Sequence, residues 1–562
     1  MQLVSFSFIK GLKKMKSRLT YIPVLGVMLL LAWMVTAAAF PEIDISIADE
    51  SNLPAPSEVK EVVAKLDQFF ATQWKEEGIN PAEPAPELAV LRRLSLSLHG
   101  SIPSLEEIRR FESDKRENRL AHWCREMLED RRFSDYFAER IARSYVGTQG
   151  EPFLIFRRDR FSGWISEQLR ANRPYDQFVR EIISQQGLWT GKPATNFITH
   201  SAMDDVLTPN KLAGRTVRSV LGQRMDCAQC HDHPFADWKQ EEFEGLAAYY
   251  GQVKLSAFGI EDDANKKYEI EDRETLEKRE ITPSVPFGQR WIPAEGTERQ
   301  KLARWCTHPE NRRFARATVN RIWALMFGKA YSEGAPYYAP VDDLPDPETD
   351  LSKPQATGLD ILADDFVKNG YNIKRLIEAI AASQSFRLDS RYETEDNDLL
   401  RHMIDHWAVF PLIRLRPEQV VGSMLQAASI KTIDQNSNLL TRTFKLIRES
   451  DFINEYGDAG DEELDERAGT VPQALLRMNG DLAKDATNPS LFNATPRIAM
   501  TSGSPIIMLE NSYLVCLSRR PTEQEQKYFL TLWAEEKNKD NSQKTYDLHW
   551  VLFNTPEFSW NH

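Results

Sequence analysis

The sequence has few of the motifs by which common enzyme classes are identified. Its 562 residues contain no HExxH motif, no phosphate-binding glycine loop and no GxSxG element. Internal repeats, low-complexity tracts and a series of alternating strands are also absent. The sequence therefore indicates no enzyme class, and any function has to be argued from other residues.

Acidic residues are missing from the start of the chain, where Glu42 is the first. Five basic residues precede an uncharged, largely apolar run from Ile22 to Phe40. This pattern predicts an export segment over residues 1–39, followed by a linker over 40–56. The run is just long enough to span a bilayer, which would suit a retained membrane anchor. The small residues Ala37-Ala38-Ala39 also suit cleavage by signal peptidase, and a cleaved signal peptide is the alternative that we favour. In both cases the body of the protein lies outside the cytoplasm, in the periplasm or cell envelope.

Basic residues are too few for a protein that binds nucleic acid. The chain has 70 Lys and Arg against 83 Asp and Glu. The predicted leader holds five of the basic residues and none of the acidic ones, which leaves 65 against 83 and a net charge of −18. A surface of this sign repels a nucleic-acid backbone.

Cysteine and histidine are also scarce, with 5 and 10 residues, and this makes one short segment informative. Cys227-Ala228-Gln229-Cys230-His231 has the CxxCH spacing by which two thioethers and one imidazole hold a haem. A chance match is expected in only about one in a thousand chains of this length and composition. The segment predicts a haem c bound by Cys227, Cys230 and His231, with His231 as the ligand of the haem iron. The predicted export agrees, because bacteria attach haem to CxxCH outside the cytoplasmic membrane.

The second axial ligand is not given by the spacing. His200 and Met203 precede the motif by one helix and are the candidates, and a five-coordinate haem is equally open. His233 is too close to His231 to reach the opposite haem face, and we expect it to contact a propionate or Asp232. Four aromatic residues could form an apolar wall for the haem, although ordinary core packing is the simpler interpretation: Trp238, Phe243, Tyr249 and Tyr250.

Two readings without haem remain open for the same residues. The ligand types of Cys227, Cys230, His231 and His233 permit zinc or another transition metal, although four ligands within seven residues crowd a tetrahedron. A CxxC disulfide is the other reading, and it leaves both histidines unexplained. The three remaining cysteines stand singly in apolar helical contexts, and we predict buried thiols at Cys124, Cys306 and Cys516. Acidic doublets such as Asp342-Asp343 are most simply solvated.

Apolar residues recur at helical spacing along most of the chain. They predict helices from Ser57 to Gly78, after a capping box of Ser104 with Glu107, and over 87–98, 117–129, 134–146, 159–171, 175–187, 209–225, 298–306, 311–327, 357–369, 373–385, 398–409, 417–428, 470–479, 505–518 and 522–537. The stretch 255–284 is crowded with charges and predicts a solvated connection with a short hairpin around Tyr268 to Ile270. The fold class is therefore mainly α, with a helical domain over 57–254 that carries the motif and an associated helical domain over 285–562.

Several blocks of the sequence resemble a known pair of domains. VLRRLSLSLHGSIP at 90–103 and LGQRMDCAQCHDHPFADWKQEEFEGLAAYYGQV at 221–253 resemble the planctomycete cytochrome-like domain of unknown function. RQKLARWCTHPENRRFARATVNRIWALMFGKA at 299–330, LRPEQVV at 415–421 and PQALLRMNGD at 472–481 are similar to its usual C-terminal companion. The resemblance implies an exported protein without a settled activity. A Cys-x-Cys element often found in the family is replaced here by Asp461–Glu466, so Cys227 and Cys230 are the only paired cysteines.

Taken together, these observations predict an exported cytochrome-c-like protein. Its expected role is electron transfer or haem-linked redox work with a partner protein in the envelope, and its only expected membrane contact is the N-terminal segment, if that is retained. The alternative is an extracytoplasmic enzyme or scaffold without haem that binds a metal or is stabilised by a CxxC disulfide.

Overall fold

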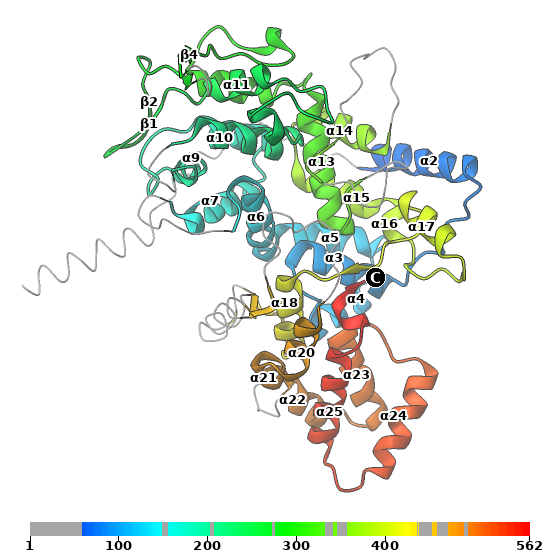
Figure 1. Cartoon of the computed structure of the whole chain (residues 1–562). Helices are drawn as coiled ribbons and strands as arrows, with labels where there is room; N and C mark the ends of the chain where they lie inside the picture. Colours follow the sequence, from blue (N-terminus) through cyan, green and yellow to red (C-terminus); the bar gives the residue numbers. More distant parts are fainter. Residues whose placement is uncertain are drawn as a thin grey trace, which may run out of the picture.

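The computed structural model describes residues 59–148, 156–202, 207–271, 276–331, 341–344, 357–434, 437, 452–453, 455–457, 470–487 and 493–562. The predicted leader and linker, Met203 and Asp461–Glu466 lie outside these residues. Within them the protein is mainly α-helical, which confirms the predicted fold class (Figure 1).

Most of the predicted helices are present, with ends close to those expected from the periodicity. The first half contains α2 (Lys60–Glu76), α3 (Glu87–His99), α4 (Leu105–Ser113), α5 (Arg119–Glu129), α6 (Arg131–Val146), α7 (Arg158–Arg170), α8 (Tyr175–Ser184), α9 (Asn196–His200), α10 (Pro209–Thr216) and α11 (Gln240–Ala248). The second half contains α12 (Glu298–Cys306), α13 (Arg312–Phe327), α14 (Gly358–Lys368), α15 (Ile373–Ala382), α16 (Gln384–Arg387), α17 (Asn397–Asp405), α18 (Pro417–Ala427), α20 (Val471–Asn479), α21 (Asp481–Thr487), α22 (Ala494–Thr501), α23 (Pro505–Leu517), α24 (Glu523–Glu535) and α25 (Asn541–Phe553).

Two predicted helices are interrupted by the local backbone. The helix predicted over 209–225 is α10 continued by a π-helical turn, Val217–Leu221, and it stops at Gly222, which has a φ of 63°. The helix predicted over 373–385 breaks at Ser383, whose backbone is extended and whose hydroxyl accepts from Phe386 N–H to cap α16. A left-handed glycine is a common helix end, and Gly222 separates the CxxCH segment from α10.

Helix α3 lies at the centre of the molecule, and every residue from Val90 to His99 is buried. Two adjacent arginines on it, Arg92 and Arg93, are both 0% exposed. A buried guanidinium is tolerated only when its N–H groups find acceptors. Two nitrogens of each side chain, Nη1 and Nη2 of Arg92 and Nε and Nη1 of Arg93, donate to backbone carbonyls of Cys516, Phe558, Phe386, Leu388 and His562, at 2.7–3.3 Å. The second half of the chain therefore folds around this helix.

The two halves of the chain pack closely together. Helix α2 packs against α14 and α15, α3 against α13, and α8 against α12. Figure 1 shows α2 beside helices of the second half. The buried hydrophobic residues of both halves form one continuous cluster, so the two predicted domains share a core.

Strands are short and occur as antiparallel pairs. Strands β1 (Val253–Ser256) and β2 (Gly259–Asp262) form a hairpin, and so do β3 (Glu269–Glu271) and β4 (Lys278–Glu280). The second hairpin confirms the one predicted around Tyr268 to Ile270. Strand β5 (Ile413–Arg414) pairs with β6 (Trp560–Asn561), which brings the C-terminus back to the middle of the molecule (Figure 1).

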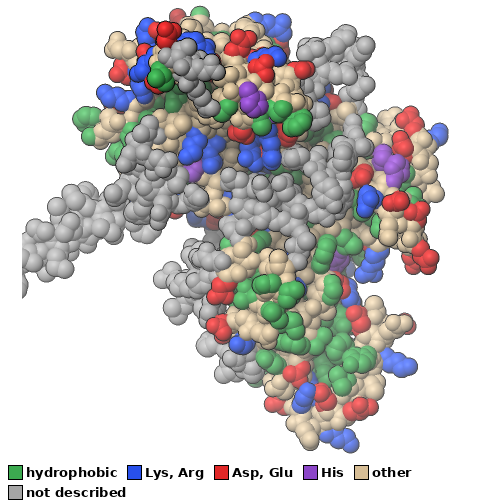
Figure 2. Space-filling model, in the orientation of Figure 1, with side chains coloured by type: hydrophobic (Ala, Val, Ile, Leu, Met, Phe, Trp, Pro, Cys, Tyr) green, Lys and Arg blue, Asp and Glu red, His purple; other side chains and the backbone are tan. Residues whose placement is uncertain are grey.

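The helices from α20 to α25 form the lower lobe in Figure 1. Helix α25 packs against α22 and α23, and α18 joins this lobe to the rest through contacts with α21 and α23. Figure 2 shows hydrophobic side chains gathered on the visible face of the lobe. Large exposed hydrophobic residues on its helices include Val471, Leu475, Met500, Ile507 and Val551.

Candidate functional site

The CxxCH segment begins at a glycine that packs tightly against the second half of the chain. A Cβ on Gly222 would lie 2.9 Å from the Cβ of Ala317 on α13, so only glycine allows this approach. The carbonyl of Gly222 accepts a hydrogen bond from Leu344 N–H at 2.9 Å. The side-chain amide of Gln223 donates to the carbonyl of Leu344 at 2.7 Å. These contacts fix the start of the segment.

A buried carboxylate also holds this segment in place. Asp342 is 5% exposed and pairs with Arg218 and with Arg224, whose Nη2 lies 2.7 Å from Oδ1. Burial alone would raise the pKa of Asp342, but the two guanidiniums outweigh it and hold the pKa below its ordinary value. The interpretation of Asp342 as a solvated acid is therefore wrong, because the fold buries it and pairs it with these two arginines.

The two cysteines of the motif lie on one short turn at the surface. Residues Asp226–Gln229 form a 3-10 helix, and Cys230 follows directly as its C-terminal cap. Residues three apart on such a helix lie on the same side of it. Cys227 and Cys230 are both exposed. Both thiols are thus accessible to a reagent or cofactor approaching from solvent.

His231 is exposed and held in one orientation by its own loop. Its Nδ1 lies 2.6 Å from the carbonyl oxygen of Asp232. Because a carbonyl only accepts hydrogen bonds, Nδ1 carries the proton in the neutral ring and Nε2 keeps its lone pair. A histidine that donates from one nitrogen and binds metal through the other is the usual arrangement of an imidazole ligand.

The residues after His231 fold the loop back onto the start of α11. The Asp232 carboxylate accepts hydrogen bonds from Gln240 N–H and from Lys239 Nζ, both at 3.0 Å, and these bonds lower the pKa of Asp232. His233 Nδ1 accepts from Phe235 N–H at 3.2 Å, and the backbone N–H of His233 donates to Trp238 at 2.8 Å. Asp232 therefore binds the start of α11, and of the two contacts predicted for His233, a propionate or Asp232, the structure shows no hydrogen bond to Asp232.

The aromatic residues after the motif belong to the core. Four of them are at most 8% exposed: Trp238, Phe243, Tyr249 and Tyr250. Phe235, by contrast, is 94% exposed. The donor set of Cys227, Cys230 and His231 fits a haem c, whereas these four rings are covered by protein and do not offer a wall to it.

Of the two candidates for a distal ligand, the described residues include only His200. It is 3% exposed, its ring centroid lies 4.9 Å from that of Phe156, and its helix α9 packs against α6, α7 and α8. Burial, with the nearby charges of Arg215 and Lys211, lowers the pKa of His200 to about 3. The structure thus buries His200 as a neutral ring in the core, while His231 lies at the surface. Met203 lies outside the described residues.

The three single cysteines are buried, as predicted, at Cys124, Cys306 and Cys516. Burial raises the pKa of Cys124 to about 12 and raises the pKa of the other two thiols as well. A protonated, enclosed thiol behaves as a small hydrophobic group. These cysteines therefore contribute to packing.

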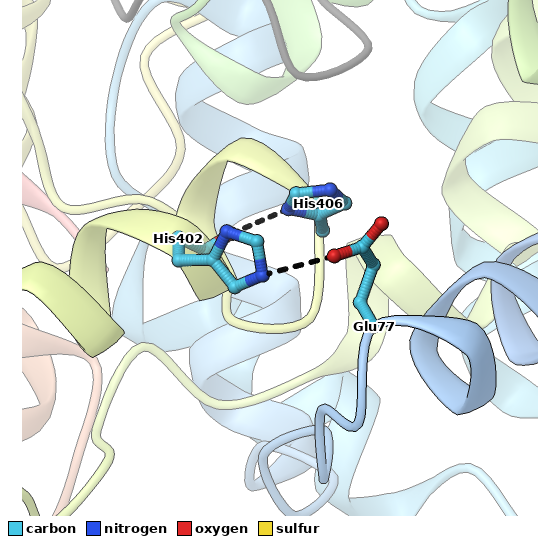
Figure 3. A group of neighbouring side chains, drawn as sticks. All are labelled: Glu77, His402 and His406. Atoms are coloured by element: carbon cyan, nitrogen blue, oxygen red, sulfur yellow. Dashed lines mark hydrogen bonds and ion pairs between the residues drawn. The ribbon is translucent and has the colours of Figure 1, made fainter.

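A second cluster of possible ligands was not predicted from the sequence. Among the described residues, only Glu77, His402 and His406 bring three candidate ligand atoms within 4.8 Å of one another (Figure 3). The residues of the CxxCH loop are not gathered in this way. The spacing of His402 and His406, four apart in a predicted helix, was the signal that could have drawn attention to the cluster.

Comparison with known protein families agrees with the order of the two halves. A family model described as "Protein of unknown function (DUF1549)" matches residues 65–255. A second, "Protein of unknown function (DUF1553)", matches residues 298–533. No curated protein and no solved structure matches the chain. Across the part of the chain that the structure describes, no helix is both long and apolar enough to cross a bilayer.

Proposed function

We propose that this protein binds one haem c covalently through Cys227 and Cys230, with His231 as an axial ligand, and serves electron transfer or haem-linked redox work in the cell envelope. The observation that carries the proposal is the motif turn. It exposes both thiols on one side and is followed directly by an imidazole whose Nδ1 is held 2.6 Å from a carbonyl.

The roles of the three residues follow from their chemistry. Cys227 and Cys230 would each hold the haem through one thioether bond, the thiol hydrogen going to the other carbon of the vinyl group. His231 keeps the lone pair on Nε2 because Nδ1–H donates to Asp232. A bound haem would supply one-electron chemistry at the iron.

The surroundings favour exchange of electrons with another protein. The loop is at the surface, and Phe235 beside it is 94% exposed. The chain without its leader carries a net charge of −18, which favours a partner with a basic contact surface. The proposed partner is therefore a redox protein of the envelope.

The test is to express the full chain in a host competent in cytochrome c maturation. The purified protein should absorb strongly in the Soret region and should be heavier than the polypeptide by about 616 Da, the mass of one haem. Cys227→Ala should weaken or abolish covalent attachment, whereas the control His233→Ala should leave it in place. A colourless protein of plain polypeptide mass from that host would overturn the proposal.

The second candidate is a protein without haem in which the same loop binds a metal or forms a disulfide, as part of an extracytoplasmic enzyme or scaffold. It is favoured by the burial of Trp238, Phe243, Tyr249 and Tyr250, which leaves the thiols without these apolar neighbours. In a colourless preparation, a Cys227–Cys230 disulfide would lower the mass by about 2 Da. Metal that is lost in Cys227→Ala would identify the metal form.

A further inference from the structure

Glu77, His402 and His406 come from two distant parts of the chain. Glu77 follows the last residue of α2, while His402 lies in α17 and His406 directly follows it. Nε2 of His402 lies 3.5 Å from Oε2 of Glu77, and the two imidazole centroids are 4.2 Å apart. Figure 3 shows the three side chains turned toward one another.

The backbone around the cluster is fixed by hydrogen bonds between the same two parts of the chain. The indole N–H of Trp74, on α2, donates to the carbonyl of His406 at 2.8 Å. Ala82 N–H donates to the carbonyl of Ala408, also at 2.8 Å. Trp74 and His406 are 3% and 7% exposed. The end of α2 is therefore held against the end of α17 before any ligand binds.

The hydrogen bond made by His406 determines which of its ring nitrogens can bind a metal. Nδ1 of His406 lies 2.8 Å from the carbonyl oxygen of His402, so Nδ1–H donates and Nε2 keeps its lone pair. A neutral His402 with its proton on Nδ1 would likewise turn a lone pair toward the Glu77 carboxylate. A neutral His402 with its proton on Nε2 would instead donate to Glu77, so the cluster is either a direct His402–Glu77 contact beside His406 or the site of a metal ion shared by all three side chains.

We propose that Glu77, His402 and His406 bind a divalent first-row transition ion such as Zn²⁺. Two imidazoles and one carboxylate form a ligand set found in zinc sites that keep their fourth position open. At the usual ligand distances, the edges of a zinc tetrahedron are about 3.3 Å. The His402–Glu77 distance of 3.5 Å already fits this value.

All three side chains can reach one ion because two of them, His402 and Glu77, lie at the surface. His402 is 41% and Glu77 47% exposed, so both can rotate toward the more buried His406. The same exposure leaves the fourth position to water. An ion here would join residue 77, within the first family match, to residues 402 and 406, within the second.

The experiment uses the full chain carrying Cys227→Ser and Cys230→Ser, so that neither haem nor a thiolate site contributes. After treatment with a chelator, the protein is titrated with Zn²⁺ and, separately, with Co²⁺. We expect one ion per chain, a rise in melting temperature, and cobalt d–d bands without the thiolate charge-transfer band that a cysteine site would give. Because loss of even an outer-shell partner weakens metal binding about 10–100-fold, His402→Ala and Glu77→Gln should each weaken binding at least tenfold.

The matched control is His122→Ala, which removes a partly exposed histidine of α5 from outside the cluster and should leave binding unchanged. The metal-free variants should melt close to the metal-free parent, since both substituted side chains are nearly half exposed. Failure of the parent to bind the ion, or equal binding by His402→Ala and the parent, would overturn the proposal and leave the cluster as a direct contact between His402 and Glu77. Neither result bears on haem attachment, which depends on Cys227 and Cys230.

Discussion

Replacing Glu418 with glutamine tests whether a buried charge cluster joins the two halves of the chain. Glu418 lies in α18 and is 5% exposed. Its carboxylate pairs with Arg140 of α6 and lies 3.2 Å from Nε of Arg416. Burial acts to raise the pKa of Glu418, but the two guanidiniums outweigh it and the pKa lies below its ordinary value of 4.5.

The glutamine variant keeps the shape of the side chain and removes its charge. Arg140 and Arg416 would then remain at the same place, with side chains only 2% and 9% exposed. Removing one partner of a buried ion pair typically costs about 3–5 kcal/mol, because the remaining charge is left without compensation. We therefore expect Glu418→Gln to lower the free energy of unfolding by that amount at neutral pH, as measured by urea denaturation of the full chain.

The pH dependence of the same measurement identifies the cause. A carboxyl group whose pKa is lower in the folded state stabilises the fold above its unfolded pKa of 4.5, and this stabilisation is lost as the pH falls through the folded value. The difference between parent and Glu418→Gln should therefore narrow below pH 4.5. The control is Glu61→Gln, which removes an exposed partner of Lys65 and should have no measurable effect. A loss below about 1 kcal/mol at neutral pH, or a loss that stays constant in acid, would refute the reasoning.

Three further predictions follow from single residues. His549 is 0% exposed, neither of its ring nitrogens has a hydrogen-bond partner among the described residues, and burial lowers its pKa to about 3. In urea denaturation, His549→Leu should raise the free energy of unfolding by about 1–3 kcal/mol, and a destabilised variant would contradict this. It should also reduce the loss of stability between pH 6.5 and pH 3, because over that range the ring of His549 takes up a proton in the unfolded chain but not in the folded protein. Ser104→Ala should cost about 1 kcal/mol in the same assay, because it removes the cap of α4, and no change would show that the cap is unimportant. If haem is bound, His200→Gln should leave its visible spectrum unchanged, and shifted bands would show that His200 is a ligand after all.

The helices could be predicted where the signals are local. The capping box of Ser104 and Glu107 is present as expected, with Ser104 N–H donating to Glu107 at 2.9 Å and Glu107 N–H to Ser104 at 3.0 Å. Helix α25 was missed, although Asp540 caps it. Its apolar residues are crowded into its second half, and its buried faces are set by α22 and α23. The spacing of its apolar residues therefore does not predict this helix.

Packing between distant segments could not be predicted. The sequence places Arg92 and Arg93 in a helix, and charged residues in helices are usually solvated. Their 0% exposure depends on carbonyls that other segments bring to α3. The burial of Asp342 has the same origin, since its partners Arg218 and Arg224 lie 124 and 118 residues away in the sequence. Charges alone do not reveal such partners.

The two candidate sites differ in the same way. Cys227, Cys230 and His231 are recognisable because the chemistry lies within five consecutive residues, and the structure adds only the exposure and orientation of the groups. The cluster of Glu77 with His402 and His406 exists only because the end of α2 is held against the end of α17, where Trp74 donates to the carbonyl of His406. A site of this kind requires both halves of the chain to be folded together. If it binds metal, separating the two halves of the chain would destroy the metal site and leave the CxxCH sequence intact.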